Sequence, residues 1–167
     1  NQPPITFRQA DIRRLDADDF VNDNFAVIHC SLVIHFMNHQ DIINLLKFIK
    51  SVSTSNTMLC MSFVANENKS ASPEYNTYLQ SVCDELIETS KSKPYEPSSD
   101  KIYHLYHPLF IKVLMEKLGY SMVAPPHEQG GFAVLSAMPN GPKLFDVRPV
   151  LRRVRDLAST HSALSRR

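Results

Sequence analysis

The chain has 167 residues, of which 43% are hydrophobic and 21% are charged, and its formal net charge is +1. This composition is typical of one globular domain with a hydrophobic core, and it excludes a disordered chain. The nearly neutral charge predicts no overall attraction to nucleic acid or to an anionic membrane. Such a partner would need a local basic patch.

The three cysteines, Cys30, Cys60 and Cys83, form no closely spaced pair. An odd number of cysteines argues against a disulfide framework and favours a reducing, intracellular compartment, where we expect the cytoplasm. No apolar run reaches the roughly 18 residues that a membrane span needs. The first residues, NQPPITF, also lack the charged start and apolar centre of a signal peptide, so we expect no membrane partner.

The first half of the chain predicts strands and one helix. Alternating apolar and polar residues predict a short strand over 5–12, and the nearly continuous apolar run 25–34 predicts a strand covered on both faces, as in a parallel sheet. Residues 39–53 carry a broad helical stripe of apolar side chains, and 55–65 are typical of a further strand. A strand, helix, strand unit needs a crossover connection and favours parallel pairing.

The second half begins with a change of composition. Residues 66–101 are a polar insert rich in Ser, Lys, Glu, Asn and Pro, with a helix expected over 74–90. Within the segment 106–123, a helix is expected to begin near Pro108 and to end at Gly119 as its C-cap, with a strand directly after it.

The last predicted strand covers 130–139 and follows a pair of glycines. Beyond it, the segment 147–167 holds six arginines. We therefore expect a domain over 1–146, which includes the polar insert, and an arginine-rich C-terminal tail over 147–167. The order strand, strand, helix, strand, insert, helix, strand, strand is an α/β pattern.

Four features of this order match a known family. An acidic residue, Asp11, ends the first predicted strand (QAD), and a later strand enters a loop above the sheet (VIHCSLVIHF). A helix and a strand follow (IINLLKFIKSV…TMLCMSF), and then a helix, LGY, a strand, a turn and a strand (LMEKLGYSMV…GGFAVLSA). Over 5–139 the chain thus resembles the C-terminal two-thirds of a class I S-adenosylmethionine-dependent methyltransferase. The resemblance implies a Rossmann-like methyltransferase sheet, incomplete or degenerate at its N-terminus.

Within that superfamily, SLVIHF is most similar to the segment of mRNA cap guanine methyltransferases that reads aromatic or polar, Phe, Ala, hydrophobic, His, Tyr. His35 and Phe36 fall on the His-Tyr pair and Leu32 falls on the Phe, whereas Ser31 replaces the usual Gln. The resemblance implies S-adenosyl-L-methionine as the cofactor and RNA, with a cap-like guanine, as the methyl acceptor.

The resemblance also implies which residues surround the cofactor. Asp11, with Ile12 beside it, would accept a hydrogen bond from the adenine amino group. Cys30, Ser31 and Leu32 would face the methyl donor, because ligands bind at the carboxyl ends of the strands in open α/β sheets. The alternative interpretations are structural: an Asp at a strand end is a common turn former, and a small residue in a buried strand serves packing.

On the acceptor side, His35 and Phe36 could stack on a flat ring or hydrogen-bond to it. His35 could also act as a general base, since its pKa lies near neutrality. Transfer to a ring nitrogen, however, needs only placement in line with the sulfonium. Tyr103, His104 and Tyr106 would lie beside the same pocket by their family position. The structural alternatives are that His35 caps the next helix and that the cluster of Tyr103, His104 and Tyr106 packs in the core.

Three further features carry weaker predictions. Glu128 belongs to EQGGF, the turn between the last two predicted strands, whose backbone could approach a substrate or form a plain hairpin. The arginines of 147–167 could contact RNA phosphates, form a solvated helix or dock onto a neighbour. We expect no metal site, because no common zinc spacing is matched by the set His29, Cys30, His35 and His39.

The glycine-rich turn that wraps the cofactor in the family has no counterpart in this sequence. None of the four glycines lies in a strand-to-helix turn near Asn1, although close backbone approach to a nucleotide-like ligand needs such residues. Two functions therefore stay open. The chain is either part of a working methyltransferase, completed by an upstream segment or another chain, or an inactive structural or interaction module of a larger assembly. In both cases we expect an unpaired sheet edge and an uncovered apolar face near 5–12.

Overall fold

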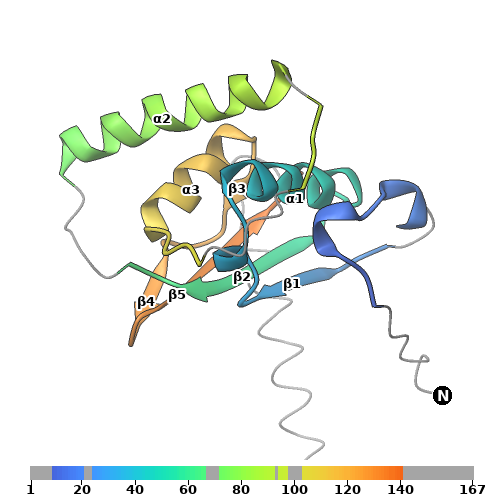
Figure 1. The fold of residues 1–167 in the computed structure, drawn as a ribbon. Coiled ribbons are helices and arrows are strands. Elements are labelled where there is room, and N and C mark those ends of the chain that lie inside the picture. The colour runs from blue at the N-terminus through green and yellow to red at the C-terminus, as the bar shows by residue number, and fades with distance from the viewer. Residues whose placement is uncertain (1–8, 21–23, 67–71, 93, 98–102, 141–167) are drawn as a thin grey trace, which may run out of the picture.

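The computed structural model describes residues 9–20, 24–66, 72–92, 94–97 and 103–140. A five-stranded sheet lies under a layer of helices (Figure 1). The main strands run in the order β1-β2-β5-β3, and β4 pairs with β5 off this path. The strands are β1 (Val27–Ser31), β2 (Met58–Val64), β3 (Ser121–Met122), β4 (His127–Gln129) and β5 (Phe132–Met138).

The strand pairing confirms the parallel unit that the sequence predicts. β1 and β2 are parallel, with Val27 opposite Met58 and Ser31 opposite Ser62. β5 is antiparallel to β2, and its first residue, Phe132, lies opposite Val64. β3 and β4 are each antiparallel to β5. The amino end of β5 therefore lies at the same edge of the sheet as the carboxyl ends of β1 and β2.

Helix α1 (His39–Ser51) makes the crossover from β1 to β2. It begins with a capping box, in which the Asn38 side chain accepts a bond of 2.9 Å from the backbone N–H of Asp41 while the Asp41 carboxylate accepts one of 3.2 Å from the N–H of Asn38. Most of the apolar stripe predicted from the sequence is buried, namely Ile42, Ile43, Leu45, Leu46 and Ile49, while its other two members, Phe48 and Val52, are half-buried.

Helix α3 (Pro108–Lys117) begins after His107, whose ring nitrogen accepts a hydrogen bond of 3.1 Å from the N–H of Leu109. Its end confirms the predicted glycine cap: Gly119 has a φ of +82°, and its N–H bonds to the carbonyl of Glu116 while that of Tyr120 bonds to Met115. This is the Schellman arrangement. Lys50 of α1 donates to the carbonyls of Leu118 and Gly119 at 2.8 and 3.2 Å, which ties the two helices together.

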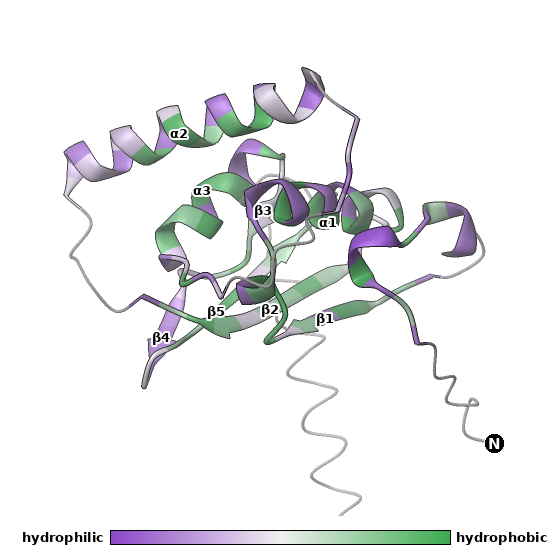
Figure 2. Ribbon diagram, viewed as in Figure 1, coloured by the Kyte–Doolittle hydropathy of each residue, from purple (hydrophilic) through white to green (hydrophobic). Residues whose placement is uncertain are grey.

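The polar insert contains α2 (Pro73–Ser92), so the helix predicted over 74–90 is confirmed. α2 forms an outer layer over α3 and α1, and Figure 2 shows hydrophilic and hydrophobic bands alternating along it. It buries Leu79 and Cys83, and Asp84 accepts an ion-paired bond of 2.6 Å from Lys117 of α3. None of the described helices is long and apolar enough to cross a membrane.

Two strand predictions are partly wrong. The run 25–34 ends as a strand at Ser31, because Leu32 adopts a φ of +53° that breaks the extended backbone, and Ile34–Phe36 form a 3-10 turn, η3. In the predicted strand 5–12, residues 5–8 lie outside the described part. Its described end is not a strand, since Asp11 caps a 3-10 turn, η1, over Ile12–Arg14. The tail 147–167 also lies outside the described residues.

Candidate functional site

The candidate site lies at the edge of the sheet where β1 and β2 end. Beyond Ser31 the chain turns away through Leu32 and η3, and beyond Val64 an isolated bridge pairs Ala65 with Tyr106. The β4–β5 hairpin reaches the same edge, since the carbonyl of Gly131 accepts a bond of 2.8 Å from the N–H of Ala65. In open α/β sheets, ligands bind at this edge.

Three residues predicted to face the methyl donor follow one another at the end of β1. Cys30 is buried in the core, and burial raises the pKa of its thiol to about 11, so the thiol behaves as a small hydrophobic group. Ser31 points to the opposite face, where its hydroxyl lies 3.0 Å from that of Ser62. The N–H of Leu32 donates to the carbonyl of Ser62 at 2.8 Å, and the Leu32 side chain is 44% exposed.

Leu32 is the one non-glycine residue with positive φ in the described part of the chain. A leucine side chain in this region is strained, and such strain persists only where the surroundings impose it. Here the bond from its N–H to Ser62 holds the backbone. The strained turn thus leaves an apolar side chain exposed directly after Ser31, at the end of β1. Ser62 carries no sequence signal that marks it as a site residue, because only the register with Ser31 brings it there.

Three aromatic rings gather next to this turn. The centroid of the His35 ring lies 4.1 Å from that of Phe36 and 4.6 Å from that of Tyr103, and the rings of Phe36 and Tyr103 meet edge to face at 5.7 Å. Phe36 is 60% exposed and Tyr103 is 50% exposed, whereas His35 is only 5% exposed. Two of the segments predicted to lie on the acceptor side are thus in contact, with His35 beneath two exposed rings.

Backbone bonds hold this aromatic cluster in place. The N–H of His104 donates to the carbonyl of His35 at 2.8 Å, which fixes the segment containing Tyr103 against η3. The Tyr106 hydroxyl donates to the carbonyl of Met37 at 2.6 Å. Tyr106 itself is buried and stacked on Phe110, and burial raises its pKa, so this side chain supports the site from the core.

Burial lowers the pKa of His35, so its imidazole is neutral at pH 7. Its Nδ1 atom is buried and has no hydrogen-bond partner among the described residues. An unpaired buried polar atom costs about 1–3 kcal/mol. A neutral imidazole can accept a proton or a hydrogen bond, and the two exposed rings above it can stack on a planar group.

The remaining predicted cofactor residues lie in η1. The Asp11 carboxylate accepts two bonds of 2.9 Å from the Arg13 guanidinium and one of 3.0 Å from the N–H of Arg13. These bonds lower the pKa of Asp11. Ile12 packs against the hydrophobic core. Both residues thus have structural partners of the kind that the turn-forming interpretation predicts, and a cofactor contact by either one stays a prediction.

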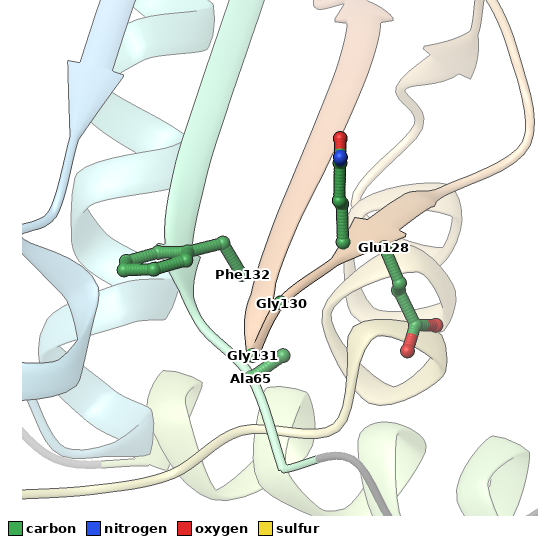
Figure 3. Close-up of a pocket in the computed structure, with 6 residues that line it drawn as sticks. Ala65, Glu128, Gly130, Gly131 and Phe132 are labelled. Carbon is green, nitrogen blue, oxygen red and sulfur yellow. The ribbon is translucent and has the colours of Figure 1, made fainter.

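Glu128 is exposed in β4 and lies beside the two-residue turn that joins β4 to β5. Gly130 and Gly131 have φ values of +57° and +78°, as a tight hairpin turn requires. In Figure 3 the Phe132 ring and the Glu128 carboxylate point away from each other on either side of this turn. The hollow beside it has a volume of about 280 Å³ and is lined by Ala65, Glu128, Gln129, Gly130, Gly131 and Phe132.

These residues provide only part of a cofactor site. The serine hydroxyls, the Leu32 turn and the aromatic cluster can contact a methyl donor and a flat acceptor. Gly130 and Gly131 join two strands, β4 and β5. They therefore do not form the strand-to-helix turn that would wrap a nucleotide. No group of three or more potential metal-ligating His, Cys, Asp or Glu side chains occurs in the described part of the chain.

No family model and no curated protein matches this sequence. Solved structures do match its fold. An O-methyltransferase family protein from Burkholderia thailandensis has a TM-score of 0.51 and 11% identity, over 83% of this chain and 36% of that chain. The SAH-bound form of CalO1, a methyltransferase in calicheamicin biosynthesis, has a TM-score of 0.49 and 8% identity, over 79% of this chain and 33% of that chain.

At 11% identity the first of these matches shows the fold alone. Together with the strand order, it confirms the predicted α/β class, with a sheet similar in fold to the Rossmann-like sheet of that O-methyltransferase family protein. The chain spans about a third of the length of both matched proteins, 36% and 33%.

Proposed function

We propose that this chain is part of an S-adenosylmethionine-dependent methyltransferase and carries the acceptor side of its active site. The observation that carries the proposal is the joint position of the Leu32 turn and the aromatic cluster of His35, Phe36 and Tyr103. Both lie at the carboxyl edge of a methyltransferase-like sheet, where this class of fold binds ligands. When bound, S-adenosylmethionine supplies an electrophilic methyl group on a sulfonium.

Each residue of the edge has a distinct task in this proposal. Ser31 and Leu32 border the donor, since Ser31 is the last residue of β1 and Leu32 begins the turn beyond it. Phe36 and Tyr103 hold the acceptor ring by stacking and exclude water from it. His35, kept neutral by burial, accepts a hydrogen bond or a proton from the acceptor when the methylated atom carries one.

The acceptor that we propose is a planar ring in RNA, with a cap-like guanine as the first candidate. The support is the likeness of SLVIHF to the cap enzymes and the presence of two exposed stacking rings next to His35. Stacking on an aromatic side chain contributes about 1–3 kcal/mol per base. A small planar molecule could use the same cluster, so the test compares both kinds of acceptor.

The protein purified with its natural assembly partners should become labelled by ultraviolet cross-linking to radioactive S-adenosylmethionine and transfer the label to capped RNA. Phe36→Ala and Tyr103→Ala should each raise the KM for the acceptor about tenfold through lost stacking. Tyr78→Ala, at an exposed tyrosine of α2, is the matched control and should leave the KM unchanged. Transfer to a small phenol but not to capped RNA would overturn the RNA acceptor and leave the methyltransferase proposal intact.

A catalytically inactive methyltransferase-like module is the second candidate function. The absence of a glycine-rich strand-to-helix turn from the sequence favours it, as does the engagement of the Asp11 carboxylate by Arg13. A natural assembly that neither cross-links to S-adenosylmethionine nor transfers a methyl group would support this module and contradict the enzyme.

A further inference from the structure

The two faces of the sheet differ in what covers them. Alternate residues of the strands point into the core beneath α1 and α3, as Leu59, Met61 and Phe63 of β2 do with no exposed area. The helices lie on this one side of the sheet (Figure 1). The residues between them share the opposite, open face, as the strand register requires. On the open face, β1, β2 and β5 contribute Val27, His29, Ser31, Met58, Cys60, Ser62, Val64, Phe132, Val134 and Ser136, and β4 adds His127 and Gln129 at the margin.

The part of the open face that β1, β2 and β5 form carries no Asp, Glu, Lys or Arg side chain. Val27, Phe132 and Val134 are 53%, 49% and 41% exposed on it. A sheet face that meets water normally alternates polar residues with the buried ones, whereas strands that are apolar on both sides belong to sheets covered on both faces. The composition of this face is therefore that of a buried layer, although none of the described helices covers it.

The outer edge of β1 is also unpaired among the described residues, since β1 ends the strand order. The carbonyl of Ala26 and the N–H of Leu32 both bond to β2. Because alternate residues of a parallel strand bond to the same neighbour, the peptide groups of Val27, His29 and Ser31 point away from β2. No lysine or proline protects this edge, although natural edges that stay exposed usually carry such residues.

We propose that the open face and the outer edge of β1 form one docking surface for a polypeptide segment from outside these 167 residues. The segment adds a β-strand along β1 and lays an uncharged, apolar helix face over Val27, Ser62 and Val134. This inference concerns assembly alone and holds whether or not the chain transfers methyl groups.

The partner must cover the open face and also pair with the outer edge of β1. This double requirement distinguishes between the possible partners. A second copy paired through β1 across a two-fold axis would satisfy the edge but leave the open face in water. A helix from the chain's own segment 141–167 could cover the face but would leave the edge unpaired. In the fold match, this chain corresponds to 36% of the O-methyltransferase family protein, so further polypeptide accompanies the matched part there.

Site-specific photo-cross-linking tests the proposal. The full chain would carry benzoylphenylalanine at position 29, on the open face of the edge strand β1, or at position 134, on the open face of β5, in cells that make the protein naturally. We expect both positions to link to peptides of one polypeptide that are absent from residues 1–167. The control at position 78, an exposed tyrosine of α2, should not link to it.

A pair of matched substitutions checks where the segment docks. Ser62→Arg puts a charge at the centre of the open face and should lower the cross-linking yield from position 29 about tenfold, because a buried unpaired charge is costly. Ser81→Arg puts the same charge on the exposed side of α2 and should leave the yield unchanged. Links between two copies of the chain, links to residues 1–8 or 141–167, or no link from either position would each overturn the proposal.

Discussion

The two faces of the sheet have similar apolar residues but differ in whether other parts of the described structure cover them. Beneath α1 and α3, strand residues such as Met61 and Leu135 are fully buried, and helix caps, the Lys50 bonds and the α2 layer close the structure over them. On the other face, strand residues of similar hydrophobicity meet water. The difference shows that the sequence of β1, β2 and β5 is suited to two covering layers, of which the described residues supply one.

Neighbouring residues of β5 give the strongest test of this contrast. Leu135 is fully buried, whereas Val134 is 41% exposed on the open face. Leu135→Ala should lower the free energy of unfolding by about 2–5 kcal/mol, because it leaves a cavity in the core. Val134→Ala should lower it by less than about 1 kcal/mol. Urea unfolding of the two variants measures both values, and equal losses would mean that the open face is already covered.

The contact between Lys50 of α1 and the end of α3 at Gly119 provides a test on the covered side of the sheet. Gly119 has a φ of +82°, and a Cβ atom there would lie 2.6 Å from Nζ of Lys50. Gly119→Ala should cost about 1–2 kcal/mol of unfolding free energy from backbone strain alone. Gly119→Asn should cost less, because Asn tolerates this conformation. Thermal unfolding compares the two, and a neutral Ala variant would contradict the cap geometry.

The buried histidine His35 should make the stability of the closed side depend on pH. Burial lowers its folded-state pKa below the ordinary value of 6.5, so near pH 6 the unfolded chain binds more protons than the folded one. Stability should therefore fall as pH falls below about 6.5. His35→Gln should show a smaller loss between pH 7.5 and 5.5 in urea unfolding. An unchanged loss would show that His35 is not buried in its neutral form.

The open face provides the smallest expected effect on stability. Val134→Lys should change the free energy of unfolding by less than about 0.5 kcal/mol, as is usual for an exposed position. It should nevertheless reduce the fluorescence of a hydrophobic dye such as ANS on the folded chain. Tyr78→Lys on α2 is the control and should keep more of the signal. A dye signal that neither substitution changes would argue against an exposed apolar face.

Much of the architecture follows from local patterns. Three elements are predicted correctly because their signals depend only on neighbouring residues in the chain. The apolar stripe of residues 39–53 predicts α1, Gly119 predicts the end of α3, and the glycine pair 130–131 predicts the start of β5. The end of β1 is not predicted, since the apolar run continues to Ile34 and no residue type in it marks the positive φ of Leu32 that ends the strand. The sequence predicts a free edge near 5–12, whereas among the described residues the outer edge of β1 is unpaired, and this position likewise depends on tertiary pairing.

The candidate site likewise has a part that the sequence predicts and a part that depends on tertiary contacts. His35, Phe36 and Tyr103 were expected on the acceptor side, and the structure brings their rings into contact. Tyr106 has the same local composition as Tyr103, yet its hydroxyl is directed into the core toward the carbonyl of Met37. No pattern in the sequence separates two tyrosines three positions apart in one segment. Their burial depends on the bridge between Tyr106 and Ala65 of the neighbouring strand end.

Amide hydrogen exchange of the 167-residue chain tests most directly whether the outer edge of β1 is unpaired and free to accept a docking strand. The account predicts protected amides at Ile28 and Cys30, which bond to β2, and fast exchange at His29 and Ser31, which point outward. It also predicts that the amides at positions 29 and 31 become protected when the docking segment is present. Equal protection at all four positions in the isolated chain would mean that the edge is already paired, and it would contradict the account.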